Sequence, residues 1–180
     1  FIGMDFDRGL QMLKELIEAG HVSSKLTVHG KTQVGPLRML GVRRACTMKD
    51  VGPSMEQALL ETRQKMERAG LSLGEVAMSV YHKLDVKQQR FDYTSGYVVA
   101  DLPTSTPNGL STWSIPNTNA FRVDHQGSYT HLGNAWSVAN QLTRYHKMKF
   151  CKHHPFELYR VAGADMTPAE LVTEVYLPLK

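Results

Sequence analysis

The chain has 180 residues, of which 42% are hydrophobic and 21% are charged, and it carries a formal net charge of +4 at pH 7. This balance is typical of a folded protein of one or two domains and argues against intrinsic disorder. No run of residues approaches the ~18 consecutive apolar positions that a membrane span needs, and no signal peptide is visible. Two cysteines are too few for a disulfide framework, so we expect a reducing compartment, most simply the cytoplasm.

The first expected element is an amphipathic helix over residues 5–20. Apolar residues recur every three or four positions and would share one face of this helix, namely Phe6, Leu10, Leu13 and Ile17. An isolated helix of this length is marginal in water, so we expect that face to be buried against this domain, another domain or a partner. Residues 21–31 are polar and show no period, which predicts a linker.

After the predicted linker, the order strand, helix, strand, strand occurs twice. The first copy is expected at 37–47, 54–69, 75–84 and 93–100, and the second at 120–125, 128–147, 155–161 and 172–179. Within the two copies, Ser79-Val80-Tyr81 matches Glu157-Leu158-Tyr159. The predicted fold class is therefore α+β, with two tandem βαββ repeats related by a pseudo-two-fold, helices packed on an antiparallel sheet, and a ligand groove between the repeats.

Between the two copies, residues 102–118 are rich in Pro, Ser, Thr and Asn. Long loops inside a compact domain are uncommon and are often lids or binding loops. Trp113 lies in the middle of this segment. It would contact a ligand if the segment is a lid, or else pack on the domain.

The second copy resembles the GyrI-like small-molecule-binding domain, also called the AraC-type effector-binding domain. The motifs that carry the resemblance are Asp124-His125-Gln126-Gly127-Ser128-Tyr129, Leu132 and Trp136, Pro155-Phe156-Glu157-Leu158-Tyr159, and Thr173-Glu174-Val175-Tyr176-Leu177-Pro178-Leu179. The resemblance implies a groove between the two units that takes a hydrophobic, often cationic, small molecule. Relatives joined to DNA-binding domains use the ligand in transcription regulation, and some stand-alone relatives are similar to hydrolases of strained cyclopropane-containing compounds.

The N-terminal segment resembles a different family. Gly3-Met4-Asp5-Phe6-Asp7-Arg8-Gly9-Leu10, with Leu13-Lys14 and Ile17-Glu18 behind it, is similar to the last helix of START-like (SRPBCC) lipid-binding domains. On this reading, residues 1–30 are a remnant helix and linker, and residues 31–180 are the effector-binding domain.

Glu157 is the leading candidate site residue. Strand alternation places Glu157 and Tyr159 on one face and Phe156 and Leu158 on the other. In an apolar groove the pKa of this carboxyl would rise, and the group could neutralise a cationic ligand or act as a general base for water. The alternative is a solvent-facing glutamate, although the resemblance assigns a ligand-contacting glutamate to this motif.

Aromatic residues complete the predicted site. Tyr129 and Tyr159 would stack on a planar or cationic ligand, and Tyr81, the repeat partner of Tyr159, would line the opposite wall. Trp113 and Trp136 are further candidates for ligand binding. For Trp136, packing of its helix on the core is the competing interpretation.

No motif predicts a metal or another cofactor: the sequence lacks HExxH, a spaced Cys-His set, GxSxG, a Walker loop and GxGxxG. The basic residues between 144 and 154 lack a nucleic-acid-binding signature around them, so we expect no direct nucleic-acid contact by this segment. Three functions stay open, namely a small-molecule sensor or sequestering module, a hydrolase that uses Glu157, and a gyrase-inhibitor-type protein-binding module. A homodimer also stays open.

Overall fold

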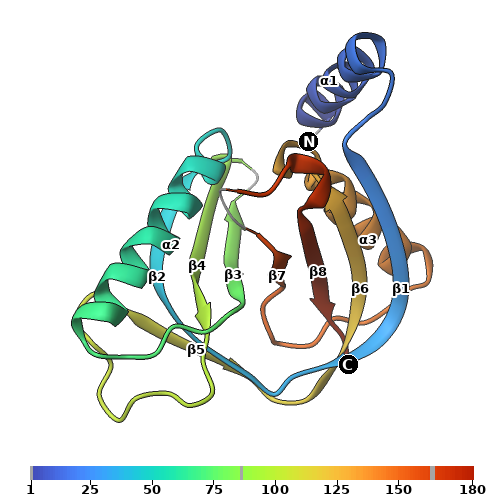
Figure 1. Ribbon diagram of the computed structural model, residues 1–180. Helices are drawn as coiled ribbons and strands as arrows, with labels where there is room; N and C mark the ends of the chain where they lie inside the picture. The colour runs from blue at the N-terminus through green and yellow to red at the C-terminus, as the bar shows by residue number, and fades with distance from the viewer. Residues whose placement is uncertain (1, 86, 163–164) are drawn as a thin grey trace.

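The structure is a computed structural model that describes residues 2–85, 87–162 and 165–180 (Figure 1). Within this part of the chain, 8 strands form one curled antiparallel sheet in the order β1-β6-β8-β7-β3-β4-β2-β5. The strands are β1 (Ser24–Val34), β2 (Leu37–Thr47), β3 (Ala77–Asp85), β4 (Arg90–Val98), β5 (Ser111–Ile115), β6 (Thr118–Gly127), β7 (Phe156–Val161) and β8 (Val172–Pro178). The helical elements are α1 (Ile2–Ala19), α2 (Val51–Arg68) and α3 (Gly133–Tyr145), with short 3₁₀ turns η1 (Tyr129–His131) and η2 (Pro168–Glu170).

The sheet order reads as two matching halves, which confirms the predicted α+β fold of two βαββ units. The first unit is β2-α2-β3-β4 and the second is β6-α3-β7-β8, and in each unit the last strand lies between the other two. The halves meet where β3 pairs with β7, and Ser79 lies opposite Glu157 in this pair. Ser79 and Glu157 are the same number of residues apart in the chain as Tyr81 and Tyr159. The pseudo-two-fold axis therefore passes at the Ser79–Glu157 pair and relates the two tyrosines.

One additional strand precedes each βαββ unit in the chain, and these two strands are exchanged between the halves. β1 precedes β2 in the chain but pairs with β6, and β5 precedes β6 but pairs with β2. The two short connections meet closely, because a Cβ on Gly35 would lie 2.6 Å from the carbonyl oxygen of Pro116. Gly35 also has a φ of +99°, so glycine is required there on both counts. Together with the β3–β7 pairing, this exchange joins the halves into one sheet.

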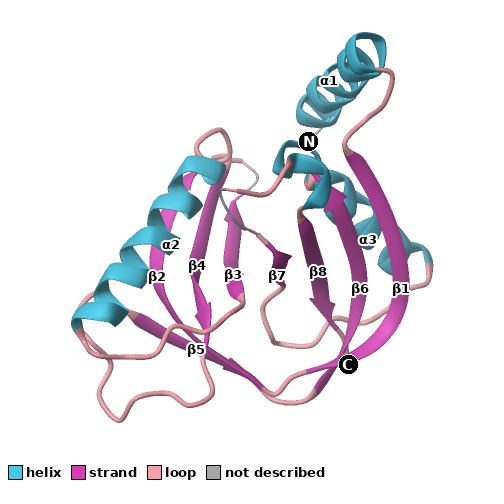
Figure 2. Ribbon diagram, viewed as in Figure 1, coloured by secondary structure: helices cyan, strands magenta, loops and turns pink. Residues whose placement is uncertain are grey.

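The helices α2 and α3 cover the same face of the sheet (Figure 2). Under α2, Met55, Ala58 and Met66 pack with Leu40, Val42 and Tyr93, whereas Ala135 and Ala139 of α3 pack with Phe121, Val123 and Val175. A third cluster, which includes Met78, Val80, Phe156, Leu158 and Tyr176, covers the opposite face of the central strands. The centre of the sheet on the helix side therefore lies between two separate cores.

Two predictions about connecting segments were wrong. Residues 21–31, expected to be a linker, form most of β1. Residues 102–118, expected to be one long loop, contain β5. Both strands are half-exposed at an edge of the sheet, so their residues lack the apolar alternation of a buried strand. The expected helix over 128–147 begins instead with η1 and continues as α3.

The N-terminal helix is confirmed, but its apolar face is not buried against this domain. Phe6, Leu10, Leu13 and Ile17 are each at least half exposed, up to 75% for Ile17. The helix contacts the rest of the structure through polar groups instead, among them Glu15. Among the described residues, no helix is both long enough and apolar enough to cross a membrane.

Candidate ligand-binding site

Glu157 lies at the centre of the sheet, in β7, and its side chain is only 1% exposed. Three side chains donate hydrogen bonds to its carboxylate. The hydroxyls of Tyr81 and Tyr159 donate to Oε2 at 2.9 and 2.7 Å, and the indole N–H of Trp136 donates to Oε1. These donors come from β3, β7 and α3, so the site joins both halves of the fold.

Among the residues that the structure describes, the carboxylate of Glu157 has neutral hydrogen-bond partners and no cationic partner. Burial raises its pKa, and the hydrogen bonds from Trp136, Tyr159 and Tyr81 oppose that rise only in part. None of the ion pairs found among the described residues includes Glu157.

Glu174 gives the contrast within the same sheet. It is also buried, but it accepts from Arg122 at 2.7 Å and from Arg160 at 2.8 Å. An isolated buried carboxylate is unfavourable unless it gains a cation or a proton, so Glu157 is a position where a bound cation would be stabilised.

Aromatic rings surround the carboxylate. Tyr81 meets Trp136 edge to face with ring centres 5.1 Å apart, and Tyr129 meets Tyr159 in the same way at 5.9 Å. Tyr129 is 44% exposed, while Tyr81 and Trp136 are partly buried. Ring faces attract cations, by about 0.5–2 kcal/mol each. Aromatic side chains therefore enclose the Glu157 carboxylate, and Tyr129 is the most exposed of them.

Met55 of α2 and Ser79 of β3 complete the site. The Sδ atom of Met55 lies 3.9 Å from the Tyr81 hydroxyl and 4.0 Å from the Tyr159 hydroxyl. Ser79 is buried, and its Oγ lies 3.1 Å from the Tyr159 hydroxyl, to which it can donate while Tyr159 donates to Glu157. Sequence reasoning missed Ser79 as a site residue, although its alignment with Glu157 in the repeat was a usable signal.

The structure brings together five of the six predicted site residues: Glu157, Tyr159, Tyr129, Tyr81 and Trp136. Trp113 lies apart from them. It belongs to β5 and packs on Phe156, with ring centres 5.6 Å apart, in the cluster on the opposite face of the sheet. Trp136 packs against the α3 core, and its indole also contacts Glu157, so its part in ligand binding stays a prediction.

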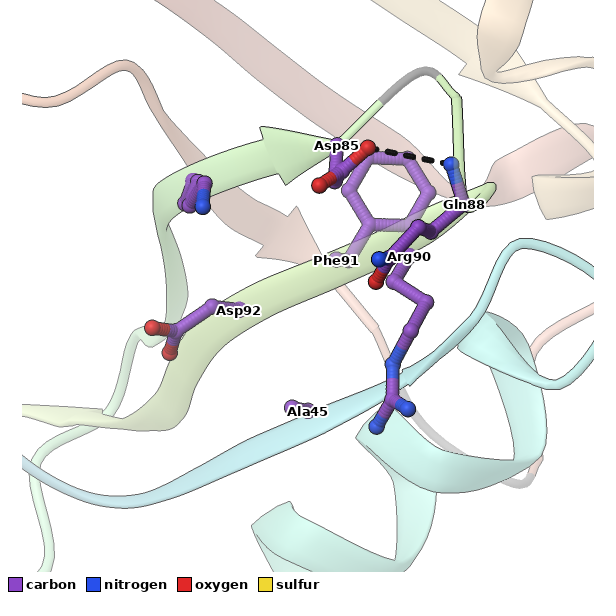
Figure 3. Close-up of a pocket in the computed structure, with 7 residues that line it drawn as sticks. Ala45, Asp85, Gln88, Arg90, Phe91 and Asp92 are labelled. Carbon is purple, nitrogen blue, oxygen red and sulfur yellow. Dashed lines mark hydrogen bonds between the residues drawn. The ribbon is translucent and has the colours of Figure 1, made fainter.

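Two cavities among the described residues lie away from Glu157. One of about 260 Å³ is at the β3–β4 hairpin, lined by Ala45, Lys83, Asp85, Gln88, Arg90, Phe91 and Asp92 (Figure 3). Another of about 510 Å³ lies by the end of α2, with Leu40, Met66 and Leu71 in its lining. The space beside the Glu157 carboxylate is filled by the aromatic rings and Met55. A ligand would therefore have to displace some of these side chains.

No metal centre is evident in the described part of the chain, where no three His, Cys, Asp or Glu side chains gather as a metal ion would require. His125 and His131 are both buried, but they contact Ser24 and Glu15 respectively.

The family model described as the GyrI-like small molecule binding domain matches residues 31–180. The chain belongs to this family. This GyrI-like chain has the same fold as three solved structures. It matches a chain of the EcmrR–DNA complex with a TM-score of 0.70 and 18% identity, covering 99% of this chain and 66% of that one. It therefore spans only part of that protein's length.

Two further matches cover nearly all of the other protein. The EcmrR C-terminal domain has a TM-score of 0.64 and 20% identity, covering 87% of this chain and 98% of that one. SAV2435 bound to tetraphenylphosphonium has a TM-score of 0.55 and 14% identity, covering 88% and 94%. No curated protein sequence matches the chain significantly. The predicted membership of the GyrI-like family is confirmed, and the resemblance of residues 1–20 to a START-like helix stays a prediction.

Proposed function

We propose that the chain binds an apolar organic cation at Glu157, between its two βαββ units, and acts as a sensor or sequestering module. The observation that carries the proposal is the buried carboxylate, which has three neutral donors and no cation among the described residues. A cation of low hydration would neutralise this group without the large desolvation cost that a compact, strongly hydrated ammonium would bring.

The aromatic lining supports the same class of ligand. Tyr81, Tyr129, Tyr159 and Trp136 offer apolar area together with ring faces that attract positive charge. Met55 adds a flexible wall that can adapt to ligands of different shape. SAV2435, which shares the fold, has been solved bound to tetraphenylphosphonium, an ion of this class.

Ligand entry would open the closed arrangement. Tyr129 is the most exposed aromatic residue of the site, and Tyr81 and Trp136 are partly exposed. Rotation of these rings would give the cation access to Glu157 while the sheet that carries the carboxylate stays in place. The binding-competent state is then a rearrangement of side chains, and part of the binding free energy is spent on populating it.

The test compares two probes of nearly the same shape and opposite charge, tetraphenylphosphonium and tetraphenylborate. Calorimetric titration of the wild-type chain should show much tighter binding of the cation, since the site holds an uncompensated negative charge. Equal affinity for the two ions would contradict the proposal, because the recognition would then be by shape and apolar area alone. Turnover of a cyclopropane-containing electrophile by the wild type, lost in Glu157→Gln, would support the hydrolase alternative.

A further inference from the structure

The segment that follows β6, residues 128–136, consists of η1 and the first turn of α3, and it has two sides. At its two ends, Tyr129 and Trp136 belong to the site: the Tyr129 ring meets Tyr159, and the Trp136 indole donates to Glu157. Between these ends, His131 and Asn134 contact the N-terminal helix α1 instead. One short segment therefore touches the candidate ligand site on one side and α1 on the other.

Glu15 makes a polar contact from α1 to this segment. Its Oε1 lies 2.8 Å from Nε2 of His131, a ring that is completely buried and whose Nδ1 has no hydrogen-bond partner among the described residues. The hydrogen bond from His131 lowers the pKa of Glu15, so the carboxylate is charged at neutral pH. Asn134 adds a second contact, with its amide nitrogen 3.4 Å from the sulfur of Met12.

The connection between α1 and β1 packs tightly on the start of the same segment. The backbone N–H of Ser128 donates to the carbonyl of Ser23 at 3.0 Å. A Cβ on Gly127 would lie 2.1 Å from that carbonyl oxygen, and Gly127 has a φ of +139°, so only glycine fits. A shift of this connection would therefore move residues 127 and 128 with it.

We propose that Glu15 is a positioning residue of the ligand site, which it acts on by holding His131 and thereby the segment that carries Tyr129 and Trp136. This inference rests on the proposed function for its effect on ligand affinity. Since the apolar face of α1 is exposed, these polar contacts hold the helix in place, and loss of the Glu15 contact would leave the buried His131 ring without its partner. By linkage, a ligand that fixes Tyr129 and Trp136 would in turn stabilise the docked position of α1.

The experiment uses Trp113→Phe as its background, so that Trp136 is the sole tryptophan. Glu15→Ala is compared with Glu18→Ala on the next turn of α1, where Glu18 is exposed and lies 4.0 Å from Lys14. Glu15→Gln serves as the conservative variant that can still accept from His131. The measurements are Trp136 emission and hydrogen exchange of residues 128–136 without ligand, and then titration with tetraphenylphosphonium.

Glu15→Ala should shift Trp136 emission to longer wavelength, speed exchange in residues 128–136, and weaken tetraphenylphosphonium binding by about fivefold or more. Glu18→Ala should match the parent, and Glu15→Gln should recover most of the loss. In the parent, saturating tetraphenylphosphonium should slow exchange in residues 12–19, which tests the coupling without any change at Glu15.

Unchanged emission and exchange in Glu15→Ala would overturn the positioning role. If the parent does not bind tetraphenylphosphonium but Glu15→Ala still alters emission and exchange, the positioning role stands and the proposed ligand class fails. The two ideas are therefore refuted by different results.

Discussion

Replacing Glu157 with glutamine removes the negative charge at the centre of the site and keeps the length of the side chain. In the wild type this carboxylate is 1% exposed, so its attraction for a bound cation is little screened by water. At an effective dielectric constant of about 20, two opposite unit charges about 6–8 Å apart attract each other by roughly 2–3 kcal/mol. At about 1.4 kcal/mol per tenfold, Glu157→Gln should weaken tetraphenylphosphonium binding roughly ten- to a hundredfold or somewhat more.

The assay is calorimetric titration of both variants with tetraphenylphosphonium and tetraphenylborate. The glutamine variant should lose affinity for the cation and hold or gain affinity for the anion, so that the selectivity collapses. Glu174→Gln is the matched control, because Glu174 is also buried but is paired with Arg122 and Arg160. It should keep the wild-type selectivity even if the protein becomes less stable.

The reasoning would be refuted if Glu157→Gln bound tetraphenylphosphonium as tightly as the wild type. A similar loss in Glu157→Gln and Glu174→Gln would also contradict it, since the effect would then come from general destabilisation. A loss for both probes in Glu157→Gln alone would indicate that the carboxylate shapes the pocket and does not recognise charge.

Four further predictions follow from the same structure. Burial raises the pKa of Glu157, so on acidification the affinity for tetraphenylphosphonium should begin to fall at a pH above the pKa of an ordinary glutamate. An affinity that stays constant between pH 4 and 8 would contradict this. Tyr129→Ala should weaken binding about two- to thirtyfold while Tyr129→Phe retains it, as measured by titration, because the ring face and not the hydroxyl contacts the cation. Trp113→Ala should leave affinity unchanged but lower stability by about 3 kcal/mol in urea unfolding, since Trp113 packs on Phe156 away from the site. Burial lowers the pKa of His125 from 6.5 to about 4, so between these pH values the unfolded chain binds more protons than the folded chain. The free energy of unfolding should therefore fall by up to about 3 kcal/mol as the pH drops from 6.5 to 4. Unfolding measured as a function of pH should show this fall in the wild type and not in His125→Gln.

The repeated βαββ units could be predicted from the sequence because their strands and helices bury one face each, which leaves a period in the apolar residues. The strands β1 and β5 could not be predicted from the sequence, for a physical reason. They pair with strands far away in the chain, β1 with β6 and β5 with β2, and they lie half-exposed at the edges of the sheet. Their backbone partners fix their conformation, while their side chains carry little pattern.

Strand alternation and the internal repeat predicted part of the candidate site. Alternation placed Glu157 and Tyr159 on one face of β7, and the repeat added Tyr81 at the equivalent position of β3. The position of Trp113 could not be predicted, because the sequence does not show which strand pairs with β5 or on which face of the sheet Trp113 lies. For α1, periodicity predicted the helix, but its apolar side does not pack on this domain.

The position of a bound cation tests the central claim most directly. A crystal of the chain soaked or grown with tetraphenylarsonium would reveal the arsenic atom by its anomalous scattering. We predict a single strong peak beside the Glu157 carboxylate, among Tyr81, Tyr129 and Trp136, with those rings moved from their present positions. A peak in the cavity at the β3–β4 hairpin or in that beside the end of α2, with the rings around Glu157 unmoved, would contradict the account.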